Sequence, residues 1–372
     1  MADPGEPLAH VEKAPGYGKR FAHRTHSFIN AGIGAAAFIL SAVAVHSILP
    51  QPDVGPVSAK VRYFCKHKDE FDTFFIGSSH IYREVVPETF DQISSERGVP
   101  TRSFNMGMNG MHPPESLHVL EQALRCKPSH LKWVWIELEE LYSKIPQESL
   151  TTRRMVYWHD LPLTWLTVSK SVNPDGHRAW RKIFAGALGS ETVRNHLGLL
   201  IKNFANVGHG RDVLDSCLRR RGDDNDVRQF SARRGYVPKI NQARTEERIG
   251  EEDLTATDMA TYPVRLREET ENARHEAVDP ITEKMFRKAA NELKPFGAKL
   301  ICVVPPNLSQ TQFSFRGKPP PGPTIEFNDA NKYPALYQSG MRVDPGHLSD
   351  EGAQLFTRLL AERFVTEVAL GK

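Results

Sequence analysis

The sequence has few cysteines and no long run of one charge, and both shortages exclude classes of protein. Its four cysteines, Cys65, Cys126, Cys217 and Cys302, lack the C-x-x-C spacing of zinc sites and redox motifs. The formal net charge is only +3 over 372 residues, and no long basic run is flanked by aromatics, so we expect no nucleic-acid partner. Whether Cys65 and Cys126 pair in a disulfide depends on the compartment, which composition leaves open.

Residues 28–49 contain no Lys, Arg, Asp or Glu. Their length is close to the roughly 20 apolar residues that cross a bilayer. Basic residues precede this stretch in residues 1–27, which we expect to be a disordered cytoplasmic tail, so the remaining chain should lie outside. Two alternatives are a signal peptide cleaved after Ala42-Val43-Ala44, which places the remaining chain on the same side, and a buried soluble helix.

One short stretch combines a buried strand with a serine-bearing turn. Thr73–Ile76 is rich in aromatic and β-branched residues and predicts a buried strand. Gly77–Ser79 predicts a tight turn at its carboxyl end. Because α/β sheets place ligands and reacting groups at the carboxyl ends of their strands, Ser79 is a candidate nucleophile.

Strands alternate with helices over residues 57–372, which predicts an α/β domain whose parallel sheet is covered on both faces. Residues 151–280 are expected to be an insertion that caps the sheet, loop-like over 207–260 and mobile inside. A long loop is expected between residues 304 and 343. Further strands are expected near 101–105, 132–138 and 299–304, and helices near 57–69, 114–125, 162–171, 192–205, 281–293 and 350–370. Residues 84–97 are expected to be helical or irregular.

A D-x-x-H pair, Asp344 and His347, precedes the last expected helix. Serine is a weak nucleophile until a base takes its proton, and that base needs a carboxylate to fix its tautomer. Asp344 and His347 are close enough in sequence to serve Ser79 in these roles. The backbone N–H groups of Ser79 and Gly110, which closes a turn after the 101–105 strand, are candidate oxyanion donors.

Each of these pieces also has a structural interpretation. A Gly-Ser-Ser turn is common, and His347 could be a cap near the last helix. His80 and His112 lie near the site in sequence but are expected to face solvent or to pack. Glu137 and Glu139 follow the alternation of the third strand, so they could face the site or be structural.

The pieces, in this order, resemble the SGNH (GDSL-like) hydrolase superfamily. In that family a strand leads into Gly-Asp-Ser, a second block reads Asn-x-x-x-x-Gly, and a last block reads D-x-x-H before the C-terminal helix. The resemblance covers residues 70–142 and 280–370, about half of the chain, with Ser78 in place of the family's Asp. The matching positions are Gly77, Ser79, Asn105, Gly110, Asp344 and His347.

Within the superfamily, the sequence looks most like membrane-anchored proteins linked to O-acetylation of exported polysaccharides and cell-wall polymers, such as the alginate acetylation and DltD-like proteins. The resemblance implies an SGNH-like (flavodoxin-like) three-layer sandwich, held on the periplasmic side of a bacterial inner membrane by one helix. It also implies a serine esterase or O-acyltransferase that acts on an acylated saccharide or envelope polymer. Ser79 would accept the acyl group, and His347 and Asp344 would activate it. No metal or organic cofactor is implied, and other subunits of a polysaccharide complex are further candidate partners.

The sequence departs from the family at the third block. The family offers an Asn side chain to the oxyanion there, whereas the strand here continues as Glu139-Glu140-Leu141-Tyr142. Losing one oxyanion donor costs about 10²–10³ in kcat. Either another group replaces it, with Asn109 as the candidate, or the protein is a catalytically weak or inactive scaffold of a polysaccharide modification or export complex.

Overall fold

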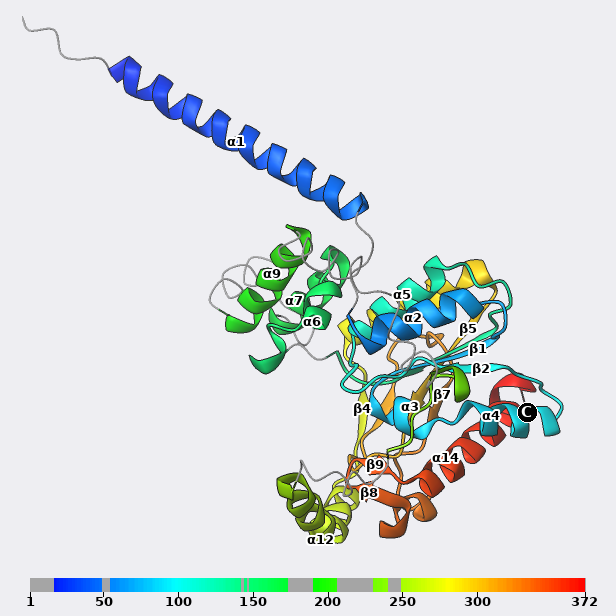
Figure 1. The fold of residues 1–372 in the computed structure, drawn as a ribbon. Coiled ribbons are helices and arrows are strands. Elements are labelled where there is room, and N and C mark those ends of the chain that lie inside the picture. The colour runs from blue at the N-terminus through cyan, green and yellow to red at the C-terminus, as the bar shows by residue number, and fades with distance from the viewer. Residues whose placement is uncertain are drawn as a thin grey trace, which may run out of the picture.

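The computed structural model describes residues 17–48, 54–141, 144–145, 147–172, 190–205, 230–239 and 249–371. Within these ranges an N-terminal apolar helix precedes an α/β body whose centre is a parallel sheet flanked by helices (Figure 1). The sheet has five strands in the order β2-β1-β3-β5-β7. The bounds are β1 Thr73–Ile76, β2 Ser103–Asn105, β3 Trp133–Glu137, β5 Lys299–Val304 and β7 Thr324–Glu326.

Side chains of the sheet alternate between two apolar layers, as the pleat requires. Phe74 and Ile76 pack on one face, whereas Phe75 packs on the other. Helices α2 Pro56–His67, α5 Glu115–Arg125 and α13 Pro280–Leu293 contribute to the first layer. Helices α3 Ser79–Glu84, α4 Pro87–Glu96 and α14 Asp350–Arg363 contribute to the second. The expected parallel sheet with helices on both faces is confirmed.

Local capping explains where two of these helices begin. Asp279 caps α13 by accepting hydrogen bonds from the backbone N–H groups of Ile281 (3.0 Å) and Thr282 (3.1 Å), and Pro280 occupies the first turn. Ser349 caps α14 by accepting from the N–H of Gly352 at 3.2 Å. The chain continues past α14 as a π-helical segment, Phe364–Ala369, so the expected C-terminal helix is confirmed over nearly its whole length.

Two expectations about loops are wrong in part. The stretch after β5 contains β7, which completes the sheet but has three residues and therefore no readable period. Residues 249–260, expected to be loop, belong to helix α12 Ile249–Glu271, which is too polar to show an apolar stripe. Residues 207–229 and 240–248 of that expected loop lie outside the described residues. The remaining short elements are η1 Gln147–Ser149, β4 His275–Ala277, η2 Lys294–Phe296, β6 Gln312–Ser314, η3 Pro334–Tyr337, η4 Ser339–Met341, β8 Arg342–Asp344 and β9 His347–Leu348.

The first part of the stretch expected as an insertion is a helical unit beside the sheet, formed by α6 Arg153–Tyr157, α7 Leu161–Val172 and α9 Glu191–Phe204. Helix α12, from the end of the same stretch, contacts β8 and η4 instead. The two helices expected from apolar spacing are confirmed as α7 and α9. Helix α7 contacts both α9 and α13, so the unit is joined to one edge of the α/β body. Figure 1 shows this unit in green, between the body and the N-terminal helix.

The N-terminal helix α1, Tyr17–Ile48, is apolar over Ser27–Val45 and is long enough there to cross a membrane. A signal sequence near the N-terminus would have the same length and composition. Side chains 27–45 are exposed except for Ala42, so the alternative of a buried core helix is wrong. The helix also begins inside the stretch expected as a tail, because no proline interrupts residues 17–27. Residues 1–16 lie outside the described residues.

A disulfide joins Cys65, near the end of α2, to Cys126, which follows α5; their Cα atoms are 5.4 Å apart. Cys302 is buried in β5 as a free thiol, and Cys217 lies outside the described residues. The bond therefore ties together two helices on the same face of the sheet. Disulfides of this kind persist in oxidising compartments.

Removal of this disulfide should destabilise the protein. The bridge spans 61 positions of sequence, so its loss should lower the free energy of unfolding by about 2–4 kcal/mol through the larger entropy of the unfolded chain. Thermal unfolding of the full chain in detergent, compared with the Cys65→Ser/Cys126→Ser variant, measures this. Wild-type protein treated with dithiothreitol is the matched control and should unfold at the variant's temperature. An unchanged midpoint in both would contradict the prediction.

Candidate active site

The structure brings Ser79, His347 and Asp344 together, although 268 positions separate the serine from the histidine. The Oγ atom of Ser79 lies 2.8 Å from Nε2 of His347. On the other side of the ring, Nδ1 of His347 lies 2.9 and 3.1 Å from the two carboxylate oxygens of Asp344. In this geometry Asp344 can fix the ring while Nε2 takes the serine proton.

The turn between β1 and α3 presents Ser79 as the first residue of the helix. Ser78 caps α3, because its Oγ accepts a hydrogen bond from the backbone N–H of His80 at 3.3 Å. A Cβ atom at Gly77 would come within 2.5 Å of both the Glu137 carboxylate and the Ile81 side chain. Position 77 is therefore glycine because these side chains approach the backbone closely.

The hairpin β8–β9 carries the other two groups. Asp344 ends β8 and His347 begins β9, so the D-x-x-H spacing corresponds to one tight antiparallel turn. Asp344 Oδ1 also accepts from the backbone N–H of Gly346 at 2.8 Å, which holds the turn closed. The N–H of Leu348 donates to Oε1 of Glu84 at 3.1 Å and links β9 to the end of the serine helix. This hydrogen bond joins α3, which carries Ser79, to the hairpin that carries Asp344 and His347.

Neighbouring charges keep Asp344 ionised and His347 neutral. Burial opposes ionisation of Asp344, but hydrogen bonds from His347 and Lys239, with their charges, hold the pKa of this carboxyl well below its usual range. Burial lowers the pKa of His347; its bond to Asp344 opposes that effect, and the charges of Lys239 and His80 add to it. His347 is thus a neutral imidazole near pH 7 and can accept a proton.

Lys239 is a site residue that the sequence did not reveal. Its Nζ donates a hydrogen bond to Oδ2 of Asp344 and lies 3.0 Å from Nδ1 of His347. Because an ammonium group can only donate, Lys239 and a protonated His347 Nδ1 compete for the same carboxylate. Lys239 precedes Asp344 by 105 positions in a polar stretch, where nothing in the sequence links the two.

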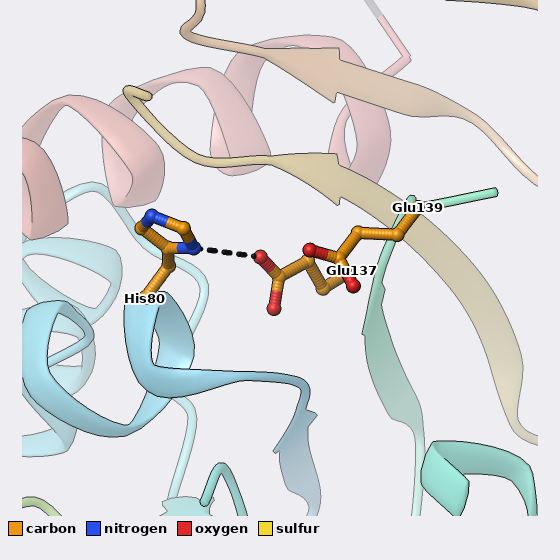
Figure 2. Close-up of side chains that lie close together, drawn as sticks. All are labelled: His80, Glu137 and Glu139. Carbon is orange, nitrogen blue, oxygen red and sulfur yellow. Dashed lines mark hydrogen bonds and ion pairs between the residues drawn. The ribbon is translucent and has the colours of Figure 1, made fainter. Parts of the chain in front are cut away.

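A second polar cluster lies on the other side of Ser79. The Glu137 carboxylate accepts from the backbone N–H of Ser78 at 2.5 Å and from its hydroxyl at 3.0 Å. It also lies 3.2 Å from Nδ1 of His80, as Figure 2 shows. The His80 ring stacks against that of His347, with centroids 5.4 Å apart. His80, expected to face solvent or to pack, is therefore part of the site, and both Glu137 and Glu139 lie on its side of the strand end.

The His80–Glu137 pair is charged. Burial alone would lower the pKa of His80, but the hydrogen bond to Glu137 and the charges of Glu84, Glu137 and Glu139 raise it to about 9. Burial opposes ionisation of Glu137, but the bonds from His80 and Ser78 hold the pKa of this carboxyl low. The result is an imidazolium–carboxylate pair directly beside Ser79.

In the part of the chain that the structure describes, two groups of side chains bring enough ligand atoms together for a cation. In the first, ligand atoms of His80, Glu137 and Glu139 lie within 4.8 Å of one another (Figure 2). Here a cation would need the His80 nitrogen without its proton, and the pKa of about 9 opposes that. Glu139 is also held by His112, whose Nδ1 lies 2.9 Å from the carboxylate. In the second group, His118, Glu121 and Asp160, the Glu121 carboxylate is already paired with Lys288.

Asn105, at the end of β2, anchors helix α3. Its side-chain amide donates to the carbonyls of Ile81 (2.6 Å) and Val85 (2.7 Å), and its Oδ1 accepts from the N–H of Gly107 (2.9 Å). Buried Lys60 donates to the carbonyls of Asn105 (3.1 Å) and Gly107 (2.6 Å) from beneath. The turn after β2 is thus held firmly against α3.

The two expected oxyanion donors of this turn lie at its surface. Gly110 is exposed and has φ +62°, which favours glycine, and the Asn109 side chain accepts a hydrogen bond from Nε of Arg83 at 3.3 Å. Within the described residues, no hydrogen bond joins either of them to Ser79. Their role as donors therefore stays a prediction.

The His80–Glu137 pair should make stability depend on pH. The folded-state pKa of His80 is about 9, above the ordinary 6.5, so the pair's contribution is complete below pH 6.5 and disappears as pH rises through 9. Between these values the free energy of unfolding should fall by ~3 kcal/mol. Thermal unfolding at several pH values measures this, with His80→Gln as the control, which should lack the fall. The same pH dependence in both proteins would show that the pair is not charged.

Comparison with protein-family models finds no matching family, and searches of curated proteins and of solved structures find no match either. The function is therefore argued from the geometry and electrostatics of the site itself.

Proposed function

We propose that this protein is an SGNH-type serine esterase or O-acyltransferase with Ser79 as its nucleophile. The observation that carries the proposal is the 2.8 Å contact between Ser79 Oγ and Nε2 of a His347 ring that Asp344 holds from behind. A Gly-Ser-Ser turn or a D-x-x-H pair alone is weak support. Their convergence on one hydrogen-bonded chain is much stronger, because the residues come from distant parts of the sequence.

The reaction begins when Ser79 Oγ attacks the carbonyl carbon of an ester and its proton passes to Nε2 of His347. Asp344 stabilises the imidazolium that forms. The tetrahedral intermediate collapses, the C–O bond to the leaving alcohol breaks, and His347 returns the proton to that alcohol. Water or a sugar hydroxyl then attacks the acyl-enzyme, again deprotonated by His347, and Ser79 regains its proton. Water gives hydrolysis, and a sugar hydroxyl gives acyl transfer.

The developing oxyanion needs donors and positive charge close to Ser79. The backbone N–H of Ser79 at the start of α3 and that of Gly110 are the proposed donors, with Asn109 as a candidate third. The imidazolium of His80 follows the nucleophile directly in sequence and adds positive charge beside it. This charge offsets part of the loss of the family's Asn donor.

The proposed setting is the outer side of a bacterial inner membrane. The apolar window Ser27–Val45 would serve as a single anchor, and the Cys65–Cys126 disulfide supports an oxidising compartment for the body. Residues 57–372 then form one SGNH-like sandwich with the 151–280 insertion. An acylated saccharide or envelope polymer is the proposed substrate, with other subunits of a polysaccharide complex as further partners.

A second candidate function is a non-catalytic scaffold of such a complex. One observation favours it. The chain after β3 runs Leu138-Glu139-Glu140-Leu141, so it offers no side-chain amide to an oxyanion. Assays of the purified protein separate the two functions.

Ser79→Ala should abolish ester hydrolysis. Because the hydroxyl is the attacking group, kcat/KM on p-nitrophenyl acetate should fall by at least about 10³-fold. Asp344→Asn should reduce kcat while leaving the fold intact, since it removes the charge that orients His347. Ser95→Ala, on the exposed side of α4, is the matched control and should retain wild-type activity. Equal hydrolysis by wild type and Ser79→Ala would overturn the nucleophile, and no hydrolysis by wild type would favour the scaffold.

Lys239→Met should shift the pH profile. Removing the Lys239 charge should raise the pKa of His347, so the acid limb of kcat/KM should move to higher pH. Lys239→Arg keeps the charge and should leave the limb near its wild-type position. The pH dependence of p-nitrophenyl acetate hydrolysis measures both. If the acid limb of kcat/KM in Lys239→Met stays at its wild-type pH, Lys239 does not lower the pKa of His347.

A further inference from the structure

The helical unit of α6, α7 and α9 has polar side chains in its interior. His159 and His196 are fully buried, and Nε2 of the first lies 2.9 Å from Nδ1 of the second. Buried Asn203 donates to the carbonyl of His159 at 3.2 Å, and buried Thr167 donates to the carbonyl of Leu163 at 2.7 Å. The interior of the unit therefore combines hydrogen-bonded polar groups with buried apolar side chains such as Leu163 and Leu199.

The outside of the same unit exposes large apolar side chains. On α9, Leu197 is 38% exposed and Ile201 62% exposed, and their i, i+4 spacing places them on one face. On α7, Leu161 is 70% exposed and Trp165 43% exposed, with the same spacing. Helices that face water usually bury their apolar side chains and expose their polar ones. This unit buries apolar side chains and also exposes large ones on part of its surface, which indicates an apolar neighbour.

The unit lies where α1 would leave a bilayer. Helix α9 contacts α1, and Ala42, close to the end of the apolar window at Val45, is the one buried side chain among residues 27–45. Figure 1 shows α9 and α7 beside the C-terminal end of α1, on the side toward the α/β body. Arg194 and Lys202 are exposed on α9 and suit anionic lipid head groups at this level.

From this we infer that the helical unit rests on the bilayer surface beside α1, with the exposed apolar side chains of α9 and α7 in the lipid interface. Basic side chains beside such a face are typical of helices that lie in the interface. The bilayer then holds the protein at two places, the spanning helix and this platform. A second attachment fixes the orientation of the α/β body, and with it the Ser79 site, relative to the membrane.

The test places an environment-sensitive fluorophore at single cysteines of the full chain reconstituted in liposomes. The background is Cys217→Ser, because Cys65 and Cys126 are paired and Cys302 is buried. Ile201→Cys and Leu161→Cys report on the platform, and Leu40→Cys reports on α1. Ser95→Cys, exposed on α4, is the control remote from α1. The quencher is a lipid with a doxyl group near its carbonyl, and the readout is the loss of fluorescence.

We expect severalfold quenching at Ile201→Cys, Leu161→Cys and Leu40→Cys, and none at Ser95→Cys. Quenching at Ile201→Cys without quenching at Leu161→Cys supports a platform formed by α9 alone. Quenching at Leu40→Cys with none at Ile201→Cys overturns the platform and leaves the anchor standing. No quenching at any position overturns both. Oxidative cross-linking of Ile201→Cys into dimers, without quenching there, would assign the face to a second copy of the chain and also overturn the proposal.

Discussion

The site depends on one carboxylate, that of Glu137. It sits at the end of β3, accepts two hydrogen bonds from Ser78 and pairs with His80, so it holds both residues that flank the nucleophile. Its closeness is also why position 77 is glycine. Because β1 and β3 are adjacent parallel strands, their carboxyl ends meet, and a carboxylate on one strand can organise the turn that follows the other.

Two cations lie beside His347, and each acts on it through a different contact. Lys239 donates a hydrogen bond to Asp344 and competes with His347 for that carboxylate, whereas His80 pairs with Glu137 and stacks on the His347 ring. Both lower the basicity of His347, which keeps it neutral and ready to accept a proton. The same positive charge favours an oxyanion beside Ser79. The proposed active site, which has no side-chain amide donor after β3, would therefore have a physical means of stabilising a transition state.

The insertion and the N-terminal helix connect the chemistry to its location. A site at the carboxyl edge of a rigid sheet has a fixed geometry, but a single spanning helix alone would let the whole body swing. The helical unit contacts α1 on one side and α13 on the other, so it lies between the N-terminal helix and the sheet. If its apolar face rests on lipid, the distance of Ser79 from the membrane is set by the fold, which would matter for the proposed envelope substrate.

The sequence alone determined most of the sheet, the helices that cover it and the identity of Ser79, His347 and Asp344 as candidates. These features follow from local causes: strand and helix periods, the strand–Gly–Ser turn, and the short D-x-x-H spacing that one hairpin satisfies. Tertiary structure decided the rest. Strand β7 is too short to have a period, and α12 is too polar to show a stripe. The partners Glu137–His80 and Lys239–Asp344 join residues 57 and 105 positions apart, which only the packing of distant elements brings together. The exposed apolar side chains of α7 and α9 also needed the structure, because apolar spacing predicts a helix without saying which of its faces is covered.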